Sequence, residues 1–449
     1  MNNVEREKVH VVSLGCPKNL VDSEVIAATL IKDGLEITPH PEEASIIIIN
    51  TCAFILPAKE ESIDEIFRMA QMKERGRCRR LIVAGCLPQR YGSALAREIP
   101  EVDLFMGTGE IPRVADLVRD LERGDSPDDR SCIGAPTFLM HSYHPRVIST
   151  PAYMSYLKVS EGCSNRCSYC VIPAIRGRFR SREVEDVIEE AENLARRGVK
   201  EVILTAQDTT SYGRDLKSGV TLTTLLKGIV SIEGIKWIRL LYTYPMHITG
   251  ELLEIVAKEE KICNYLDIPV QHIDDEILTA MKRKGDGSRI RETLARTRKI
   301  VPGVAIRTSL IVGFPGETPK RFKNLLEFVQ ETRFDHLGVF KYSQEEGTEA
   351  AQLPRQVSER VKESRRNTIM EEQSLISYEI NQTLIGSKEE ILIEGESEIS
   401  EYDYAGRLRR QAPDIDGVTY VKSRGRSPGD IITCRITGCE EYDLYAEEL

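Results

Sequence analysis

The first 120 residues alternate short apolar runs with stretches of helical periodicity. Residues 9–15, 45–50 and 81–85 (VHVVSLG, SIIIIN and LIVAG) are predicted to be buried strands, and residues 22–34 and 61–76 are predicted to be helices. Strands that alternate with helices in this way form a parallel sheet with helices on its faces. The pattern predicts a Rossmann-like α/β domain over residues 1–123.

The periodicity is lost between residues 124 and 150, where Pro, Ser, Asp and Gly accumulate, and we predict a linker there. Over residues 151–381 strand and helix patterns alternate again. The predicted strands are MSYLKVS, EVILTAQ, WIRLLY, YLDIPV, AIRTSLIVGF and HLGVFKY, and a long charged helix follows from about residue 357. Six strand–helix units favour a partial or complete α/β barrel over an open sheet.

The last segment, residues 382–449, has a different pattern. Five short stretches alternate apolar and polar residues and are separated by Gly and Pro turns: EILIEGES, DYAGRLRRQ, VTYVKS, DIITCRITG and YDLYAE. Short alternating strands in such a compact segment predict a small antiparallel β-barrel.

The composition of the 449-residue chain indicates where the protein is located and how its cysteines are used. The longest apolar run, residues 46–49, is far too short to span a membrane, and the charged N-terminus lacks the apolar segment of a signal peptide. We therefore expect a cytoplasmic protein with no membrane association. The chain has eleven cysteines, an odd number, so metal ligation or redox chemistry is a better expectation than a disulfide framework.

Three cysteines lie within eight residues in the stretch EGCSNRCSYCVIP: Cys163, Cys167 and Cys170. A structural zinc site normally needs four ligands, and the next cysteine, Cys263, is distant. A cubane iron–sulfur cluster fits better, because three thiolates leave one iron open for chemistry. The motif also follows the first predicted barrel strand, at the end of a barrel where active sites are found.

A second set of cysteines is spread over the first domain. Cys16, Cys52 and Cys86 each follow a predicted strand, with spacings of 36 and 34 residues. Ligands gather at the carboxyl ends of parallel strands, so these thiols should converge. The alternative is three buried cysteines that pack as small apolar residues. Five other cysteines are predicted to be free thiols: Cys78, Cys132, Cys263, Cys434 and Cys439.

The CxxxCxxC motif with Tyr169 before its last cysteine resembles the radical S-adenosylmethionine superfamily. The stretches SLGCPKNLVDSE, NTCAF and AGCLPQ resemble its methylthiotransferase family, and this resemblance covers essentially the whole chain. It implies a C-terminal TRAM barrel, a [4Fe–4S] cluster that binds S-adenosylmethionine on Cys163, Cys167 and Cys170, and an auxiliary [4Fe–4S] cluster on Cys16, Cys52 and Cys86. Such enzymes replace the hydrogen of a C–H bond with a methylthio group.

The resemblance also implies cofactor contacts and an electron source. Tyr169 would pack near the adenine, although its pattern also fits an ordinary buried aromatic residue. The other implied contacts to S-adenosylmethionine are Gln207, Asp208, Gln271, Ser309 and Gly313. From its sequence alone the glycine-rich turn at Gly313 is a plain strand–helix turn, and the neighbouring His272 is equally consistent with an ordinary barrel histidine. A one-electron donor such as a flavodoxin or ferredoxin is expected.

Two branches of the family differ in substrate: one modifies an adenosine of tRNA, the other an aspartate side chain of small-subunit ribosomal protein twelve. Residues 382–449 contain eight Lys and Arg against fifteen Asp and Glu, which suits a basic protein better than tRNA, although a solvated acidic face is the simpler alternative. The pair Glu345–Glu346 and the stretches AQDTTSYG and GCPKNLVDSE resemble the aspartate branch.

Two alternatives stay open. The basic stretch IRGRFRSR, residues 175–182, would suit phosphates, cofactor carboxylates or a ribosomal partner, so tRNA is the second candidate substrate. A non-catalytic module that uses its cysteines for structural metal is the third candidate function.

Overall fold

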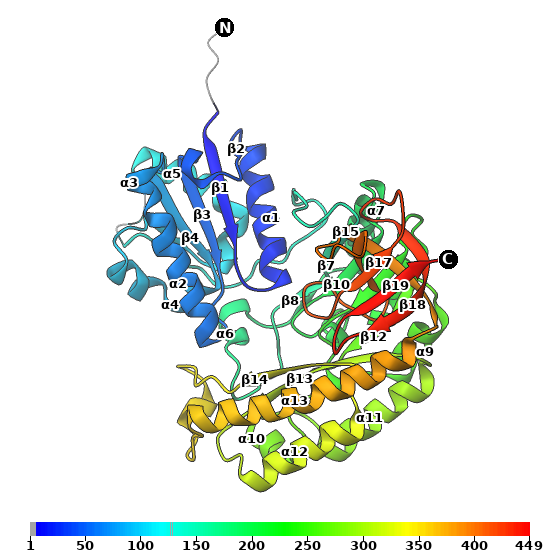
Figure 1. Cartoon of the computed structure of the whole chain (residues 1–449). Helices are drawn as coiled ribbons and strands as arrows, with labels where there is room; N and C mark the ends of the chain where they lie inside the picture. Colours follow the sequence, from blue (N-terminus) through cyan, green and yellow to red (C-terminus); the bar gives the residue numbers. More distant parts are fainter. Residues whose placement is uncertain (1–5, 126, 128) are drawn as a thin grey trace.

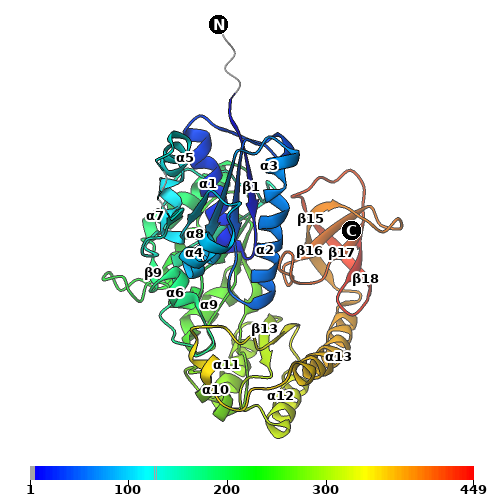
Figure 2. The same cartoon turned by 90° about the vertical axis from the view of Figure 1, so that its left-hand side faces the viewer.

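The computed structural model describes residues 6–125, 127 and 129–449. Residues 1–5, at the start of the charged stretch that argues against a signal peptide, and two residues of the expected linker lie outside the described part. Two α/β sheets and a closed β-barrel make up the molecule. The N-terminal domain, in blue, and the C-terminal barrel, in red, lie against different sides of the central domain (Figures 1 and 2).

The N-terminal sheet is entirely parallel, with the order β2-β1-β3-β4-β5-β6. Its strands are β1 (Lys8–Ser13), β2 (Glu36–Ile37), β3 (Ile46–Thr51), β4 (Arg80–Gly85), β5 (Leu104–Met106) and β6 (Ser131–Cys132). Its helices are α1 (Pro17–Lys32), α2 (Leu56–Ala70), α3 (Met72–Arg75), α4 (Cys86–Glu98) and α5 (Val114–Arg123). Every residue of β3 is buried, as its isoleucine run predicts, and β6 comes from the segment expected to be a linker.

The first helix begins earlier than its sequence pattern indicates. We expected residues 22–34, but α1 starts at Pro17, because proline suits the first helical position, where its missing N–H costs no hydrogen bond. Asp22 is therefore not a cap at the start of the helix; it lies inside α1 and is fully buried. A carboxylate in such a position needs charged partners.

The central sheet is also parallel, with the order β14-β13-β12-β11-β10-β7. Its strands are β7 (Met154–Lys158), β10 (Glu201–Thr205), β11 (Trp237–Leu240), β12 (Ile262–Asp267), β13 (Ala305–Val312) and β14 (His336–Lys341), which correspond to the six predicted strands. In the described part of the chain β7 and β14 are not paired with each other, so the sheet is a partial barrel. A separate two-stranded sheet, β8 (Ser160–Glu161) and β9 (Arg180–Ser181), flanks the cysteine loop.

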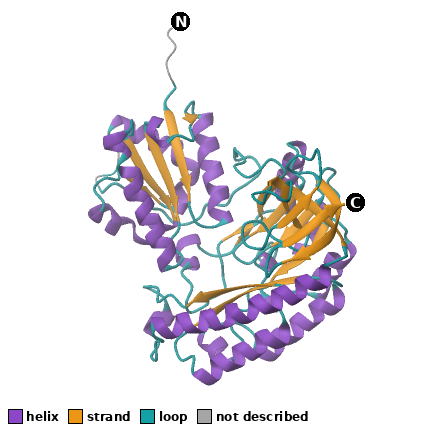
Figure 3. Cartoon of the chain, in the orientation of Figure 1, coloured by secondary structure: helices purple, strands orange, loops and turns teal. Residues whose placement is uncertain are grey.

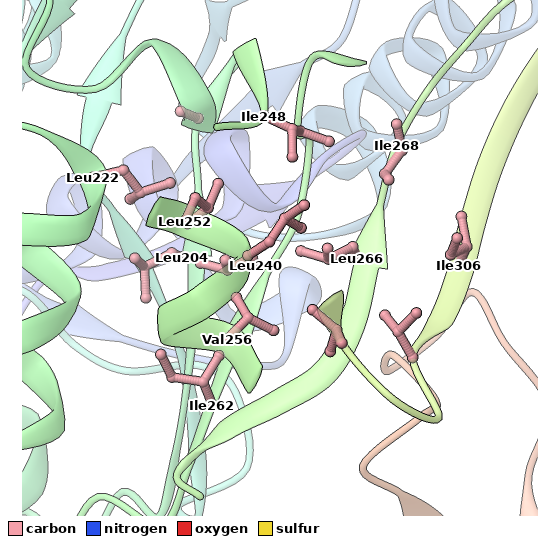
Figure 4. Packing of buried hydrophobic residues seen from close by; sticks show 14 of the residues in the cluster. Leu204, Leu222, Leu240, Ile248, Leu252, Val256, Ile262, Leu266, Ile268 and Ile306 are labelled. Atoms are coloured by element: carbon pink, nitrogen blue, oxygen red, sulfur yellow. The ribbon is translucent and has the colours of Figure 1, made fainter. Parts of the chain in front are cut away.

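Helices cover the outside of the central sheet (Figure 3). They are α7 (Val184–Arg196), α8 (Leu222–Val230), α9 (Gly250–Lys258), α10 (Asp275–Ala280), α11 (Gly287–Ile300), α12 (Pro319–Thr332) and the long α13 (Glu359–Leu384). The short α6 (Ile172–Arg176) instead packs against α4 of the N-terminal domain. Several start at a side-chain cap: Thr249 accepts a hydrogen bond from the N–H of Leu252, for example. Aliphatic residues such as Leu240, Leu252 and Leu266 pack between strands and helices (Figure 4).

The C-terminal segment forms a closed five-stranded barrel with the order β15-β16-β17-β19-β18, and its five strands are those that the alternating pattern predicts. They are β15 (Lys388–Glu396), β16 (Tyr404–Leu408), β17 (Thr419–Lys422), β18 (Ile431–Cys439) and β19 (Leu444–Glu448). One detail differs from the expectation: β17 and β19 pair in parallel, so the barrel is not wholly antiparallel. A closed barrel of five strands cannot alternate direction at every neighbour, because five is an odd number.

The C-terminal barrel rests against the starting ends of the central strands. Arg407 on β16 pairs with Glu201 at the start of β10, which also binds Arg239 of β11 (2.8 Å), and all three side chains are buried. The hydroxyl of Tyr265 donates to Asp416 of the barrel (2.9 Å). The opposite ends of the central strands, which carry the cysteine loop, are left to the N-terminal domain. Among the described residues no helix has the length and apolarity to cross a membrane.

Candidate active site

The first set of thiols lies at one edge of the N-terminal sheet. Cys16 follows β1, Cys52 follows β3 and Cys86 follows β4, and these three strands are neighbours that run in parallel. Two of the thiols stand at helix N-termini: Cys16 is the residue before α1, where its side chain makes no capping hydrogen bond, and Cys86 is the first residue of α4. The positive end of a helix favours a thiolate, so this edge suits cysteines that act as ligands.

Glycines bring the backbone of this edge together. Gly15 has φ +89°, and a Cβ built on it would lie 2.6 Å from the Cβ of Cys52. Gly85 has φ +95°, and a Cβ there would lie 2.2 Å from Oδ1 of Asn50. Any larger residue would therefore force the strand ends apart, in addition to the strain of a left-handed backbone.

Burial keeps isolated thiols of this set protonated. Cys52 and Cys86 are buried, and burial raises the pKa of the Cys86 thiol to about 12. The neighbouring thiols add to the effect: Cys16 raises the pKa of Cys52, and both raise that of Cys86. Such thiols become thiolates when a metal centre supplies compensating positive charge. The donor set and its mutual closeness fit a bound iron–sulfur cluster.

The second set of thiols lies in the loop between β8 and α6, where the central strands end. The loop is held by backbone and side-chain contacts: the N–H of Cys163 donates to the carbonyl of Gly177 (3.1 Å), and Ser168 donates through its N–H to Met281 (3.0 Å) and through its hydroxyl to Ala280 (2.7 Å). A Cβ on Gly162 would lie 2.3 Å from the carbonyl of Arg178, so this turn is also tightly packed. The loop is fixed before any ligand binds.

Cys163 is buried, whereas Cys167 and Cys170 are partly exposed. Burial raises the pKa of Cys163 to about 11 and that of Cys170 to about 12, and nearby Cys167 raises both. The described residues contain no group of three Cys, His, Asp or Glu arranged around a single metal ion. A cubane cluster does not need one, since each thiolate binds a different iron. The three thiols lie in one short loop but do not surround a single ion, and this arrangement fits such a cluster.

Tyr169 lies within the loop between the last two cysteines. It packs edge-on to Phe314 (ring centroids 6.3 Å apart), and its hydroxyl accepts a weak hydrogen bond from Arg283 (3.5 Å). Burial raises the pKa of the phenol, so Tyr169 stays neutral. The ring has the apolar neighbours that an adenine would share.

The predicted contacts Gln207 and Asp208 follow β10. The amide of Gln207 donates to Glu161 (2.7 Å), and its buried Oε1 has no hydrogen-bond partner. Asp208 accepts from Asn165 (2.8 Å) in the cysteine loop and contacts His247 (3.1 Å). Burial would raise the pKa of Asp208, but hydrogen bonds from His247 and Ser211 outweigh burial and lower the pKa below its ordinary value. Asp208 therefore helps to hold the cysteine loop in place. The buried Oε1 of Gln207, which has no partner, can accept a hydrogen bond from a ligand.

The other predicted contacts lie across the sheet. Gln271 has φ +70° and forms a bridge with β13, where its N–H donates to the carbonyl of Ser309 (2.9 Å). Gly313 has φ +74°, and its N–H donates to Glu317. Burial raises the pKa of Glu317 to about 7. The two positions flank β13, where a left-handed glutamine is strained backbone of the kind found at binding sites.

His272 is entirely buried beside Glu317. Its Nδ1 accepts from the N–H of Asp274 (3.0 Å), so the neutral ring carries its proton on Nε2. Burial lowers the pKa of His272 to about 3. The ring stays neutral and bonds to backbone, but its buried Nε2 has no hydrogen-bond partner, so His272 is not a fully satisfied barrel histidine.

Three family sequence profiles match the chain. The Radical SAM superfamily matches residues 157–329, the Uncharacterized protein family UPF0004 matches residues 8–107, and the TRAM domain matches residues 385–448. A protein of Syntrophus aciditrophicus named ribosomal protein uS12 methylthiotransferase RimO is 60% identical over 98% of both chains. A protein of the same name from Pelobacter propionicus is 52% identical over 100% of this chain and 99% of its own.

The chain belongs to the RimO family of methylthiotransferases. It is therefore a radical S-adenosylmethionine enzyme that works with [4Fe–4S] clusters and S-adenosylmethionine, as the sequence motifs predict. The fold agrees: a solved radical S-adenosylmethionine methyltransferase, TsrM from Kitasatospora setae with cobalamin and a [4Fe–4S] cluster bound, superposes with a TM-score of 0.55 at 16% identity over 75% of each chain. At that identity the likeness concerns the fold alone.

A buried charge network, which no sequence pattern indicates, joins the two sets of thiols. Asp22 of α1 accepts from Lys158 of β7 and from Arg176 of α6, and Lys158 also binds Glu161 (2.8 Å). Each of these four side chains is at most 4% exposed. Burial would raise the pKa of Glu161, but Lys158 and Arg176 outweigh it and lower the pKa. No sequence signal marks these residues, because each one alone is typical of a surface charge.

A second contact between the domains involves the pair Glu345–Glu346. Glu345, which is buried, accepts from Lys59 of α2 (2.7 Å) and from Arg90 of α4 (2.8 Å). Arg90 also donates to the carbonyl of Glu346 (2.8 Å), whose own side chain is exposed. We call Glu345, Lys59 and Arg90 the interdomain latch. It holds the helix that carries Cys86 against the central domain.

Proposed function

We propose that the enzyme adds a methylthio group to the β-carbon of an aspartate side chain in ribosomal protein uS12. The observation that carries this proposal is the position of two thiol triads on facing edges of two domains, joined by buried ion pairs. We infer that the substrate carbon binds between them, where both metal centres would act on it. The names of the close relatives supply the substrate, and the tRNA alternative is not favoured by them.

The assignment of ligands is part of the proposal. Cys163, Cys167 and Cys170 would hold the cluster that binds S-adenosylmethionine, and Cys16, Cys52 and Cys86 would hold the auxiliary cluster. When bound, these groups supply a 5′-deoxyadenosyl radical to remove a C–H hydrogen and a methylated sulfur to replace it. An unactivated C–H bond is out of reach of the acids and bases in the site.

The chain's own residues position and shield this chemistry. Two of the three cysteines in the loop are partly exposed, which leaves one side of the triad accessible to S-adenosylmethionine. Tyr169 and Phe314 offer apolar surface to the adenine, and the strained Gln271 and the turn at Gly313 would contact the rest of the cosubstrate. Buried residues behind the loop, Glu161 and Lys158 among them, keep water away from its inner side.

Charge supports a protein as the acceptor. Residues 382–449 carry a net charge of −7, and a barrel of that sign repels a phosphate backbone but attracts a basic ribosomal protein. We further propose that the reaction occurs in the cytoplasm with a small electron-transfer protein, a flavodoxin or ferredoxin, as reductant. These assignments rest on the family's chemistry rather than on a docking surface.

A two-substrate mass assay tests the proposal. The reconstituted enzyme is incubated under anaerobic conditions with S-adenosylmethionine, a reductant and either uS12 or unmodified tRNA. We expect uS12 to gain one methylthio group in place of one hydrogen, with the modified aspartate located by peptide mass spectrometry. A mass gain on tRNA alone would refute the substrate assignment, and iron and sulfide for fewer than two cubane clusters per chain would refute the assignment of the triads.

A further inference from the structure

The basic segment at residues 175–182 does not face solvent as a whole. Arg182 is fully buried and pairs with Glu190 and Asp186 of α7, so it belongs to the barrel wall. Arg176 is also buried, at 3% exposure, but it points out of its own domain toward the N-terminal one. Arg178 is exposed, so only part of the segment is available to phosphates or a partner, and the buried Arg176 needs a different explanation.

Arg176 contacts one of the thiols directly. Its Nη2 donates to Sγ of Cys86 (3.3 Å) and to Oδ1 of Asn19 (2.7 Å), and its Nη1 donates to Asp22. The amide of Asn19 in turn donates to the carbonyl of Leu14 (2.7 Å), which fixes the acceptor. A planar guanidinium with three fixed acceptors has one orientation, so the hydrogen bond to the sulfur is built into the fold.

A second buried cation follows one cysteine of the same triad along the chain. Lys18, which is 7% exposed, places its Nζ 3.4 Å above the ring of Tyr242. It lies two residues after Cys16, in the first turn of α1. Because both cations are withdrawn from water, their fields act on the triad with little screening.

In the described part of the chain, the cysteine loop of the central domain has no equivalent hydrogen bond from a cation to a thiol. Arg283, which is partly exposed, donates to Tyr169 within the loop and to the carbonyl of Pro269. An anion also bonds to the loop: Asp208 accepts a hydrogen bond from Asn165. Among the described residues, a hydrogen bond from a cationic side chain to one of the six candidate ligand thiols is found at Cys86.

We propose that Arg176, aided by Lys18, raises the reduction potential of the cluster held by Cys16, Cys52 and Cys86 above the value that three thiolates alone would give. Hydrogen bonds to ligand sulfur and nearby positive charge stabilise the more negative, reduced form of a cluster. The two clusters of one chain then differ in how easily they are reduced. Arg176 is a positioning residue in this role, and the inference rests on the ligand assignment proposed above.

The test is a redox titration followed by electron paramagnetic resonance. The full-length chain carries Cys163→Ala, Cys167→Ala and Cys170→Ala, so that one cluster per chain remains and is titrated. Iron analysis is done first: if the chain does not hold one cluster, the ligand assignment fails and not this inference. In that background Arg176→Met should shift the midpoint to lower potential, and Arg176→Lys, which keeps the charge but loses the planar fork, should shift it less.

Two further variants complete the design. Lys18→Met should lower the midpoint by a smaller amount than Arg176→Met, since Lys18 makes no hydrogen bond to sulfur. Arg180→Met is the matched control: Arg180 lies on the same segment but donates to the carbonyls of Phe138 and Arg176, so the midpoint should not move. If Arg176→Met fails to hold a cluster, the midpoint potentials of Arg176→Lys and Lys18→Met test the proposal. Midpoints equal to that of the parent in the variants that hold a cluster would overturn the proposal.

Discussion

The two thiol triads bring three cysteines together in different ways. Cys163, Cys167 and Cys170 come from a single loop, so their spacing is set by eight consecutive residues. Cys16, Cys52 and Cys86 come from three strand ends, and their spacing is set by the register of a parallel sheet. A local motif can be recognised in almost any fold, whereas a dispersed triad exists only when the whole sheet has formed.

The surroundings of the two triads differ as well. The loop triad has two partly exposed cysteines, while the sheet triad has two buried ones with a guanidinium on one sulfur. An accessible site suits a cosubstrate that binds and leaves in each turnover. An enclosed site with buried charge suits a centre that stays in the protein and is tuned by it.

Cys167→Ala should have the largest effect on the loop triad. Without the middle ligand the cluster that binds S-adenosylmethionine should be lost, and production of 5′-deoxyadenosine, measured by liquid chromatography with mass spectrometry, should be abolished. Iron content should fall by about one cluster. Cys78→Ala is the control, because that buried thiol donates to the carbonyl of Arg80 away from both triads, and cleavage that persists in Cys167→Ala would contradict the assignment.

Cys52→Ala should separate the triads. We expect it to leave cleavage of S-adenosylmethionine intact but to stop methylthio transfer to uS12, because only the sheet triad loses a ligand. Both products are quantified in the same reaction by mass spectrometry. Cys132→Ala serves as the control on the same sheet, since Cys132 lies on β6, two strands away from β4. Intact transfer in Cys52→Ala would rule out an auxiliary cluster on this triad.

A matched pair of glycine variants sharpens the comparison further. Gly15→Ala would bring a Cβ to 2.6 Å from Cys52, and Gly162→Ala would bring one to 2.3 Å from the carbonyl of Arg178. Each also forces alanine into a left-handed backbone, at a cost of about 1–3 kcal/mol. Gly15→Ala should reduce transfer more than cleavage, while Gly162→Ala should reduce both. Equal losses in the two variants would show that the edges are not independent.

Glu345→Gln should have the smallest effect on chemistry. Removing the charge leaves Lys59 and Arg90 without their shared anion, which should lower the free energy of unfolding by about 3 kcal/mol in urea titrations. Cleavage should be unchanged and transfer should fall several-fold, because the latch positions the sheet triad. Glu346→Gln, with its exposed side chain, is the control. If Glu345→Gln retained full methylthio transfer, the latch would contribute to stability but not to the position of the sheet triad.

The latch also has a pH dependence of known sign. Burial alone would raise the pKa of Glu345, but its hydrogen bonds from Lys59, Ser343 and Arg90 outweigh burial and lower it below the ordinary value of 4.5. The ion pairs therefore contribute their full stability above that pH and lose it as the pH falls below it. Unfolding curves of Glu345→Gln should accordingly converge with those of the parent in acid.

Sequence patterns predicted the strands of the central sheet and of the barrel, and β1, β3 and β4 of the N-terminal sheet, because periodicity is a property of neighbouring residues. They missed the short strands β2, β5 and β6, and the six cysteines that they single out as cluster ligands stay a prediction. They did not predict Asp22, Lys158, Glu161 and Arg176, since a buried charge is revealed only by a partner from another domain. Asp22 shows the difficulty well: the pattern treats it as a polar helix start, while the structure buries it inside α1. The left-handed Gln271 likewise has no sequence signal, because glutamine carries no preference for that conformation.

The ion pairs beneath the central strands bear on how the protein is made. Glu201 opens β10, yet its partner Arg407 is 206 residues further along the chain. During synthesis the central sheet emerges from the ribosome long before Arg407. Until then, Arg239 is the cation that pairs with Glu201. The buried charge of Glu201 therefore gains its second cation late in synthesis, when the acidic barrel docks on the central sheet.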